Sequence, residues 1–147
     1  MVIRTATLDD VPAVVEMGLR FLRTTPFGRH VHENPAQTAE FVTQLIEGAG
    51  AVFVAETGGP GLIGMLGLLP SAHPVSGELF VTEIFWYVEP AGRGSSAALR
   101  LLREGEEWTR EIGGQVLWMI APTPAVERMY ERRGFDRVEV AYQKRLT

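Results

Sequence analysis

The residues from Val88 to Leu99 read V-E-P-A-G-R-G-S-S-A-A-L and could bind a phosphate group. After Arg93 every side chain in this stretch up to residue 98 is small, so another molecule could approach the backbone closely. The first amides of a helix have no partners inside the helix and attract anions. Arg93 adds a permanently charged guanidinium group with several N–H donors, and Ser95 and Ser96 add hydroxyl donors. The stretch predicts a phosphate-binding loop; the alternative is an ordinary helix start capped by Ser95.

Two common nucleotide-binding patterns are excluded for this loop. A Walker motif would end in Gly-Lys-Ser or Gly-Lys-Thr, which this loop lacks. A dinucleotide fingerprint would need three spaced glycines after an early βαβ unit, and neither is present.

Glu83 lies inside the run L-F-V-T-E-I-F-W-Y-V, which is almost entirely apolar or aromatic. An ionisable group is costly in such a place, and burial beside Phe85 and Trp86 should raise its pKa. A carboxyl group with a raised pKa suits a general base, acting here through a water molecule. The alternative is a structural carboxylate at the sheet edge, paired with an arginine.

His30 and His32 alternate in R-H-V-H-E and raise the question of a metal site. Metal sites in proteins usually need three or four ligands, and no third firm ligand accompanies these two. We therefore expect a solvated loop and no metal. The chain has no cysteine, which excludes disulfides, thiolate metal sites and a cysteine nucleophile.

Hydrophobic periodicity and turn residues predict ten elements around these residues. The expected strands cover residues 2–7, 51–56, 62–69, 78–88, 115–120 and 137–146, and the expected helices about 9–24, 34–46, 95–112 and 124–133. The order is β-α-α-β-β-β-α-β-α-β, which indicates a mixed α/β (α+β) class. The strand at 78–88 is apolar on both faces, as is typical of a central strand.

Length and composition indicate a globular protein. A chain of 147 residues can bury a real core, and we expect one domain over residues 1–147. The net charge of −4 disfavours non-specific binding to nucleic acid, so no nucleic-acid partner is expected. No apolar run is long enough to span a membrane and no leader opens the chain, so we expect a cytoplasmic protein.

Two motifs resemble the GNAT superfamily of acyl-CoA-dependent N-acetyltransferases. Residues 88–98 are similar to that family's V-x-P strand end and Arg/Gln-x-x-Gly-x-Gly/Ala loop, with Ser96 in place of the middle glycine. Residues 129–135, M-Y-E-R-R-G-F, are similar to its Leu-Tyr-x-x-x-Gly-Phe motif. Thr123 stands about where the family has an asparagine. The order of elements also agrees across nearly the whole chain, which is therefore identified as a member.

The resemblance implies a GNAT-like central sheet, mixed and mostly antiparallel, flanked by helices and splayed beside Val88. Acetyl-CoA would be the co-substrate, with its pantetheine arm in the splay and its pyrophosphate on the loop amides. The expected cofactor-binding residues are Val88, Arg93, Gly94, Ser95, Ser96, Ala97, Ala98 and Thr123.

The resemblance also implies direct attack of an amine on the thioester, without an acyl-enzyme. Glu83 stands where members of the family often place a catalytic carboxylate. Tyr130 matches the tyrosine that protonates the departing CoA sulfur; alternatively, it is a half-buried tyrosine with a structural hydroxyl. The family commonly builds its acceptor pocket between the first two helices, so Phe27, Arg29 and His30 are expected to bind the acceptor.

The function expected from these observations is transfer of an acetyl group to a primary amine of a small molecule or peptide. One alternative is a non-catalytic acyl-CoA-binding or protein-interaction module on the same fold. Another is an acetyltransferase acting on a protein or an aminoacyl-tRNA. A homodimer is one option, because exposed apolar strand edges favour pairing.

Overall fold

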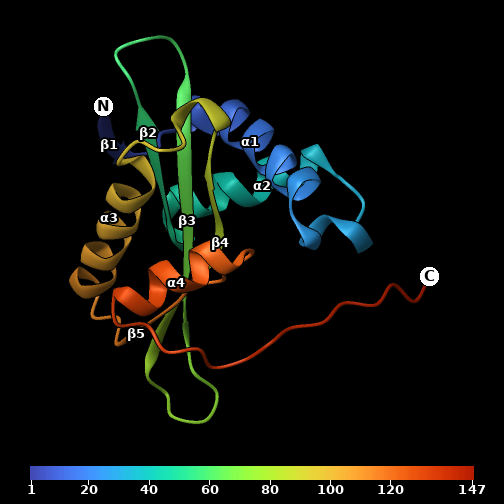
Figure 1. Cartoon of the computed structure of the whole chain (residues 1–147), viewed down its shortest axis with the longest axis vertical. Helices are drawn as coiled ribbons and strands as arrows, with labels where there is room; N and C mark the ends of the chain where they lie inside the picture. Colours follow the sequence, from blue (N-terminus) through green and yellow to red (C-terminus); the bar gives the residue numbers. More distant parts are fainter.

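The computed structural model describes all 147 residues and places one sheet between two layers of helices (Figure 1). The strands are β1 (Val2–Thr5), β2 (Ala51–Glu56), β3 (Leu62–Ala72), β4 (Leu79–Val88) and β5 (Val116–Trp118), and the helices are α1 (Val11–Thr24), α2 (Pro35–Gln44), α3 (Ala97–Glu111) and α4 (Pro124–Arg132). The strand order is β1-β2-β3-β4-β5, with only β4 and β5 parallel. The expected class, a mostly antiparallel sheet flanked by helices, is confirmed. None of the helices combines the length and apolarity that a membrane crossing requires.

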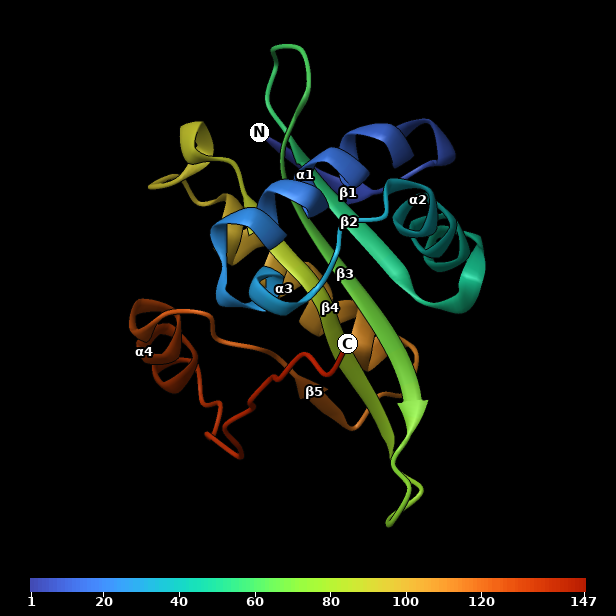
Figure 2. The same cartoon turned by 90° about the vertical axis from the view of Figure 1, so that its right-hand side faces the viewer.

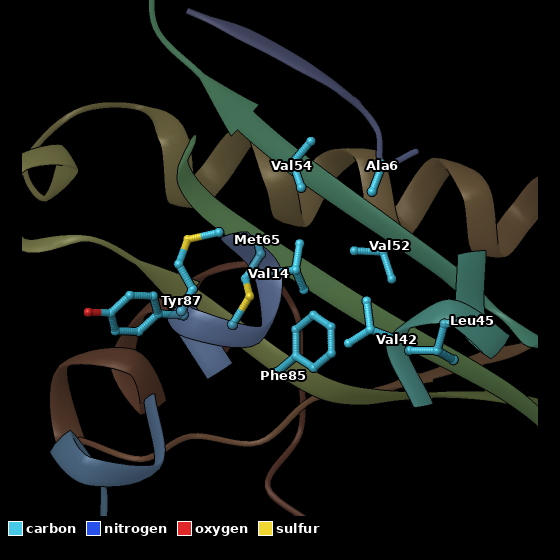
Figure 3. Packing of buried hydrophobic residues seen from close by; sticks show 10 residues of the cluster. Ala6, Val14, Val42, Leu45, Val52, Val54, Met65, Phe85 and Tyr87 are labelled. Carbon is cyan, nitrogen blue, oxygen red and sulfur yellow. The ribbon is translucent and has the colours of Figure 1, made fainter. Parts of the chain in front are cut away.

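Helices α1 and α2 cover one face of the sheet, and α3 covers the other (Figure 2). On the first face, Val14 of α1 and Val42 of α2 pack against the strands (Figure 3). The strand side chains of this cluster are Val52, Val54, Met65, Phe85 and Tyr87. On the second face, Leu101 of α3 packs against β2, β3 and β4. Each fully buried aliphatic side chain stabilises the fold by about 1.5–3 kcal/mol, so these two layers hold the sheet in place.

Polar side chains fix where the first two helices begin. The Asn34 side chain accepts a hydrogen bond from the Gln37 amide at 3.1 Å, as the capping pattern predicts. At the entry to α1, Asp9 is not the capping residue. A 3-10 turn over residues 8–10 precedes the helix, and the Asp10 carboxylate accepts the Thr7 amide at 2.7 Å. The cap is therefore Thr7 with Asp10 as its reciprocal partner.

Strand β4 carries a β-bulge that turns its two halves toward different faces of the sheet. Gly67 of β3 pairs with Phe85, but the next residue, Leu68, pairs with Glu83, so Ile84 is an extra residue on β4. Because side chains alternate along a strand, one extra residue exchanges the two faces beyond it. Glu83 therefore shares the α3 face with Leu68, whereas Phe85 and Tyr87 face α1 and α2.

The residue opposite the bulge must be a glycine. A Cβ atom on Gly67 would collide with the ring of Phe85, which lies directly over the backbone there. The ring is 8% exposed and belongs to the cluster under α1 and α2. Gly67 thus lets a large aromatic side chain cover the sheet at the bulge.

Strands β4 and β5 run side by side for only three residue pairs. Phe80, Val81 and Thr82 pair with Val116, Leu117 and Trp118. Beyond Thr82, β4 continues to Val88 beside β3 and has no strand on its other side. We call the point after Thr82 and Trp118, where the two strands separate, the fork.

The expected last strand, 137–146, is not formed, and this prediction is wrong for this structure. The chain after α4 is extended but makes no ladder with any strand. It leaves α4 and crosses toward the side of α1 and α2 (Figures 1 and 2), where the Arg145 guanidinium donates to the His30 carbonyl at 3.1 Å. Alternating residues favour a strand, but a strand also needs a neighbouring edge, and here none lies beside the segment.

Candidate active site

The edge of β4 beyond the fork offers backbone groups to an extended ligand. The Glu89 amide donates to the Ile63 carbonyl at 2.8 Å, so alternate residues on this part of β4 direct their peptide groups at β3. In an antiparallel ladder the residues between them direct theirs the other way. Trp86 therefore presents its N–H and C=O groups, and Val88 its N–H group, to the side where β5 has separated; the Val88 carbonyl accepts a hydrogen bond from Arg93 Nε. The family resemblance implies that the pantetheine arm lies at this edge.

The loop after β4 turns at Gly94 and enters α3 at Ala97, two residues later than expected. Gly94 has a φ of +85°, a conformation that side-chain-bearing residues rarely adopt. Ser96, which stands at the family's glycine position, has a φ of −78° and a ψ of 3°. A serine adopts these angles without strain, so the departure from glycine costs the backbone nothing.

Several backbone amides at the start of α3 have no acceptor within the protein. They belong to Gly94, Ser96, Ala98 and Leu99. The Ala97 amide is the exception, because it donates to the Ser95 hydroxyl oxygen at 3.2 Å. Ser95 also uses its hydroxyl hydrogen, which it donates to the Gly92 carbonyl at 2.6 Å. Ser95 therefore shapes the loop and is not the free hydroxyl donor that the sequence suggested, whereas Ser96 makes no such bonds.

Arg93 lies folded back onto the end of β4. Its Nε donates to the Val88 carbonyl at 3.1 Å, and its guanidinium carbon lies 5.8 Å from the centre of the Tyr87 ring. The Tyr87 hydroxyl donates to Glu89 at 3.1 Å, and Arg20 of α1 donates to the same carboxylate through Nε at 2.9 Å. Burial, together with the nearby Glu89 charge, raises the pKa of the Tyr87 hydroxyl above its usual value. This cluster fastens the end of β4 to α1.

Glu83 is 4% exposed and stands at the fork. Its Oε2 atom accepts the Ile120 amide at 2.9 Å and lies 3.5 Å from the Tyr130 hydroxyl. Burial raises the pKa of the carboxyl to about 7, and the two hydrogen bonds offset only part of that effect. No arginine contacts it, in contrast to the structural alternative, and Oε1 has no partner within the protein.

The Tyr130 side chain extends from α4 toward Glu83 at the fork and is 6% exposed. Its hydroxyl donates to the Ile120 carbonyl at 3.1 Å. Burial, with a smaller contribution from the Glu83 carboxylate, raises the pKa of this hydroxyl well above its usual value. The phenol therefore keeps its proton at any physiological pH and acts as a hydrogen-bond donor.

Trp86 covers Tyr130 on the side toward the end of β4. The two rings stack with centres 5.8 Å apart and planes inclined by 30°. The indole N–H of Trp86 is buried and has no acceptor within the protein. A buried donor without a partner costs free energy, so this N–H is an unsatisfied polar group beside Tyr130.

Phe27, Arg29, His30 and Thr123, which were also predicted for binding, make no side-chain hydrogen bond to Glu83 or Tyr130. Phe27, Arg29 and His30 share a 3-10 helix over residues 26–30, where Phe27 stacks on Phe21 of α1 at 5.7 Å and the other two are exposed. Thr123 caps α4, and its hydroxyl oxygen accepts the Val126 amide at 3.4 Å. Nowhere does the structure gather three or more histidine, aspartate or glutamate side chains around one point.

Sequence reasoning missed three residues of this site. Ile120 contributes only its peptide groups, so its side chain carries no signal. Arg20 and Glu89 are 69 positions apart, and a helix-face arginine gives no indication of a partner at that distance. The one available signal was the acidic residue in Val88-Glu89-Pro90, because a charge directly after a buried strand often has a partner.

Comparison with known proteins gives a family match. The model of the Acetyltransferase (GNAT) family matches residues 17–135. No curated protein matches the sequence.

Solved structures share the fold over essentially the whole chain. An aminoglycoside 6′-N-acetyltransferase from Acinetobacter haemolyticus is 21% identical, with a TM-score of 0.73 and all of both chains covered. A ribosomal-protein-alanine N-acetyltransferase from Brucella melitensis is 19% identical, with a TM-score of 0.71, covering 99% of this chain and 100% of the other. A predicted acetyltransferase from Clostridium acetobutylicum, solved with acetyl-CoA, is 15% identical, with a TM-score of 0.78 and coverages of 97% and 94%.

Proposed function

This chain belongs to the acetyltransferase (GNAT) family, and on that premise we propose that it transfers an acetyl group from acetyl-CoA to a primary amine by direct attack. Membership makes it an acyltransferase. In the proposed reaction the amine nitrogen bonds to the acetyl carbon and the carbon–sulfur bond breaks. The nitrogen loses one proton and the departing sulfur gains one, so the reaction needs no oxidant or reductant.

The residues at the start of α3 fit the phosphates of acetyl-CoA. Four amides without an acceptor in the protein lie at the N-terminus of a 15-residue helix, where an anion is favoured. The open edge of β4 fits the amide groups of a pantetheine arm. Acetyl-CoA supplies the activated acyl group and a thiolate leaving group.

The observation that carries the proposal is the position of Glu83 at the fork. Because its pKa is about 7, this carboxyl is a stronger base than an ordinary glutamate and is still ionised in half of the molecules at neutral pH. Its Oε1 atom is free to accept a proton, and at 4% exposure it would receive that proton from the amine through one water molecule.

Tyr130 is proposed to donate its hydroxyl proton toward the departing sulfur. A thiolate with a reference pKa of about 8.5 is a strong hydrogen-bond acceptor, and the phenol next to it stays protonated. Glu83 lies 3.5 Å from this hydroxyl, so a proton taken up by the carboxyl can return to the phenol after each turnover. The proposed base, Glu83, would then restore the proton of the proposed acid, Tyr130.

The acceptor class is proposed to be a primary amine on a small molecule or a peptide. Two of the structural neighbours are named for an aminoglycoside and a ribosomal protein, which are both amine acceptors. A net charge of −4 favours a cationic amine over a polyanionic aminoacyl-tRNA. Residues 26–30 are the proposed contact, through Phe27, Arg29 and His30.

Binding is tested by thermal unfolding with acetyl-CoA and, as a phosphate-bearing control, ATP. A ligand at a hundredfold excess over its Kd stabilises by about 2.7 kcal/mol, which raises Tm by several degrees. We expect a rise with acetyl-CoA and none with ATP. An unchanged Tm at millimolar acetyl-CoA would contradict the proposed cofactor site.

Turnover is tested by release of free CoA thiol with panels of small amines and peptides. The chain has no cysteine, so the thiol signal has no background from the protein. Glu83→Gln should reduce turnover about 10²–10⁴-fold, whereas the matched change at exposed Glu78 should leave it unchanged. Binding of acetyl-CoA without thiol release across both panels would favour the non-catalytic binding module.

A further inference from the structure

The β-bulge makes Glu83 and Trp86 neighbours on one face of β4. In a regular strand, residues three positions apart point to opposite faces. The extra residue, Ile84, changes this. Glu83 pairs with Leu68 of β3. Trp86 pairs with Leu66, two positions earlier on β3, and both leucines pack in the cluster under α3. Glu83 and Trp86 are therefore consecutive side chains on the α3 face, with Cα atoms about 7 Å apart.

Both side chains contact Tyr130 of α4. Glu83 Oε2 lies 3.5 Å from the Tyr130 hydroxyl, and the Trp86 indole stacks on the Tyr130 ring with centres 5.8 Å apart. On the Tyr130 ring there is also Phe135, at 5.1 Å between ring centres. Glu83, Trp86 and Tyr130 thus form one group at the fork, in which Tyr130 touches both of the others.

Two polar atoms of this group lack a partner within the protein, and they are complementary. The N–H of the Trp86 indole is a buried donor with no acceptor, and Glu83 Oε1 is an acceptor with no donor. Buried polar groups are nearly always paired, either with protein atoms or with an ordered water molecule. A buried water molecule typically makes about three hydrogen bonds to such groups. Two hydrogen bonds to one water molecule span up to about 6 Å, which suits neighbouring side chains on one face of a strand.

We propose that the Trp86 N–H and Glu83 Oε1 bind one water molecule between them, and that Glu83 takes the proton of the amine through this water. Trp86 is then a positioning residue for the reaction. The inference rests on the proposed function and adds to it the group that orients the water.

The indole fixes the orientation of the water because its N–H can only donate. The N–H occupies one lone pair of the water oxygen, so the hydrogens of the water are directed at acceptors, here Glu83 Oε1. The second lone pair is free for the amine. As the amine nitrogen bonds to the acetyl carbon, its proton passes to the water oxygen and a hydrogen of the water passes to Oε1. The water is regenerated, and the carboxylate gains the proton that the nitrogen loses.

The bound water is tested by NMR on the natural protein, without any substrate. The chain has three tryptophans, so it gives three indole N–H signals, and Trp86→Phe identifies the one of Trp86. We expect a rotating-frame cross peak between this indole proton and water, with the sign of a through-space contact and not the opposite sign of hydrogen exchange. An exchange peak alone, or no peak, overturns the proposal.

The positioning role is tested by the kinetics of thiol release. Trp86→Phe keeps a ring against Tyr130 but lacks the N–H, so kcat should fall about tenfold, the equivalent of one hydrogen bond, while KM for acetyl-CoA stays the same. Trp86→His returns an N–H on a ring and should recover part of kcat at pH 8, where histidine is mostly neutral. The matched control is Trp108→Phe, which should keep its kcat. Trp108 packs in the same cluster under α3, 6.3 Å from the Phe53 ring centre.

The two measurements separate this inference from the proposed function. Unchanged kcat in Trp86→Phe, an equal loss in Trp108→Phe, or a loss that Trp86→His does not recover overturns the positioning role and leaves the proposed acetyl transfer standing. If the natural protein releases no thiol with any amine, the proposed function fails and the proton relay fails with it. In that case the NMR cross peak still decides whether Trp86 and Glu83 bind a water molecule.

Discussion

Glu83 and Tyr130 hold the two peptide groups of the same residue. The Glu83 carboxylate accepts the Ile120 amide at 2.9 Å, the Tyr130 hydroxyl donates to the Ile120 carbonyl at 3.1 Å, and the two side chains are 3.5 Å apart. The arrangement ties β4, the chain after β5 and α4 together at the fork. The contacts that tie these three elements together therefore also join the proposed base to the proposed acid.

The raised pKa of Glu83 makes stability depend on pH. The folded protein binds this proton with a pKa of about 7, whereas the pKa of an ordinary glutamate is 4.5. Folded molecules hold more protons between these values, so the free energy of unfolding falls as pH rises from 4.5 to 7 and stays low above 7. The total effect is about 3 kcal/mol at 1.36 kcal/mol per unit.

Glu83→Gln should remove this dependence. Glutamine does not titrate and can still accept the Ile120 amide, so the variant should gain stability relative to the natural protein between pH 5 and pH 8. Urea unfolding at both pH values measures the difference, with Glu78→Gln as the exposed control. An identical change in unfolding free energy at pH 5 and pH 8 would show that the pKa of Glu83 is not raised in the folded protein.

Tyr130→Phe should separate chemistry from binding. The ring still stacks on Trp86, but the Ile120 carbonyl loses its donor, which costs about 1 kcal/mol of stability. Turnover should fall about 10²–10⁴-fold if the hydroxyl assists the leaving sulfur, while the Kd for acetyl-CoA stays the same. Calorimetric titration and thiol release measure the two quantities. Unchanged turnover would remove Tyr130 from the mechanism.

The loop before α3 should tolerate change at Ser96 and not at Gly94. Gly94→Ala places a side chain at a φ of +85°, which costs about 1–2 kcal/mol and shifts the amides that follow. Acetyl-CoA affinity should fall with it. Ser96→Ala keeps ordinary angles and should change stability little, so it is the matched control. Equal acetyl-CoA affinities for the two variants would argue that the loop does not hold the cofactor.

Much of this architecture could be predicted because its signals are local. Pro26 lies just beyond the end of α1, Asn34 precedes α2, and Gly113 and Gly134 lie just beyond α3 and α4. Each of these residues marks the end or the beginning of a helix through its own backbone preference. Glu83 was predicted for a similar reason, because one charge in an apolar strand has few explanations. Each of these inferences needs only a residue and its immediate neighbours.

The features that escaped prediction depend on distant partners. The bulge at Ile84 decides which face Phe85 occupies, but the strand is apolar on both faces, so its sequence allows either register. The pattern of residues 137–146 predicts a strand, and this prediction is wrong because a strand also needs a neighbouring edge, which the local sequence does not specify. The Arg20 contact with Glu89 joins α1 to the end of β4. The two residues are 69 positions apart, so no local sequence pattern predicts the contact.

Arg20→Ala should loosen the end of β4, since Arg20 is its ionic link to α1. The Glu89 carboxylate is 19% exposed and would keep only the Tyr87 hydroxyl, whereas the Arg20 side chain is 42% exposed, so solvent screens part of the pair. We expect a loss of about 1 kcal/mol or less, smaller at high salt, together with weaker acetyl-CoA binding because Tyr87 and Arg93 share the cluster. Arg23→Ala is the control, because Arg23 lies on the same helix and pairs with Glu33 at the surface.

Thermal unfolding at low and high salt, with and without acetyl-CoA, measures both effects of Arg20→Ala. A double-mutant cycle with Glu89→Gln isolates the pair, because the coupling vanishes if the two residues act independently. If Arg20→Ala matches Arg23→Ala in stability and in cofactor affinity, the link between α1 and the end of β4 is an ordinary surface ion pair. A larger effect on affinity than on stability would mean that α1, beside the proposed acceptor contact, controls how firmly the cofactor strand is held.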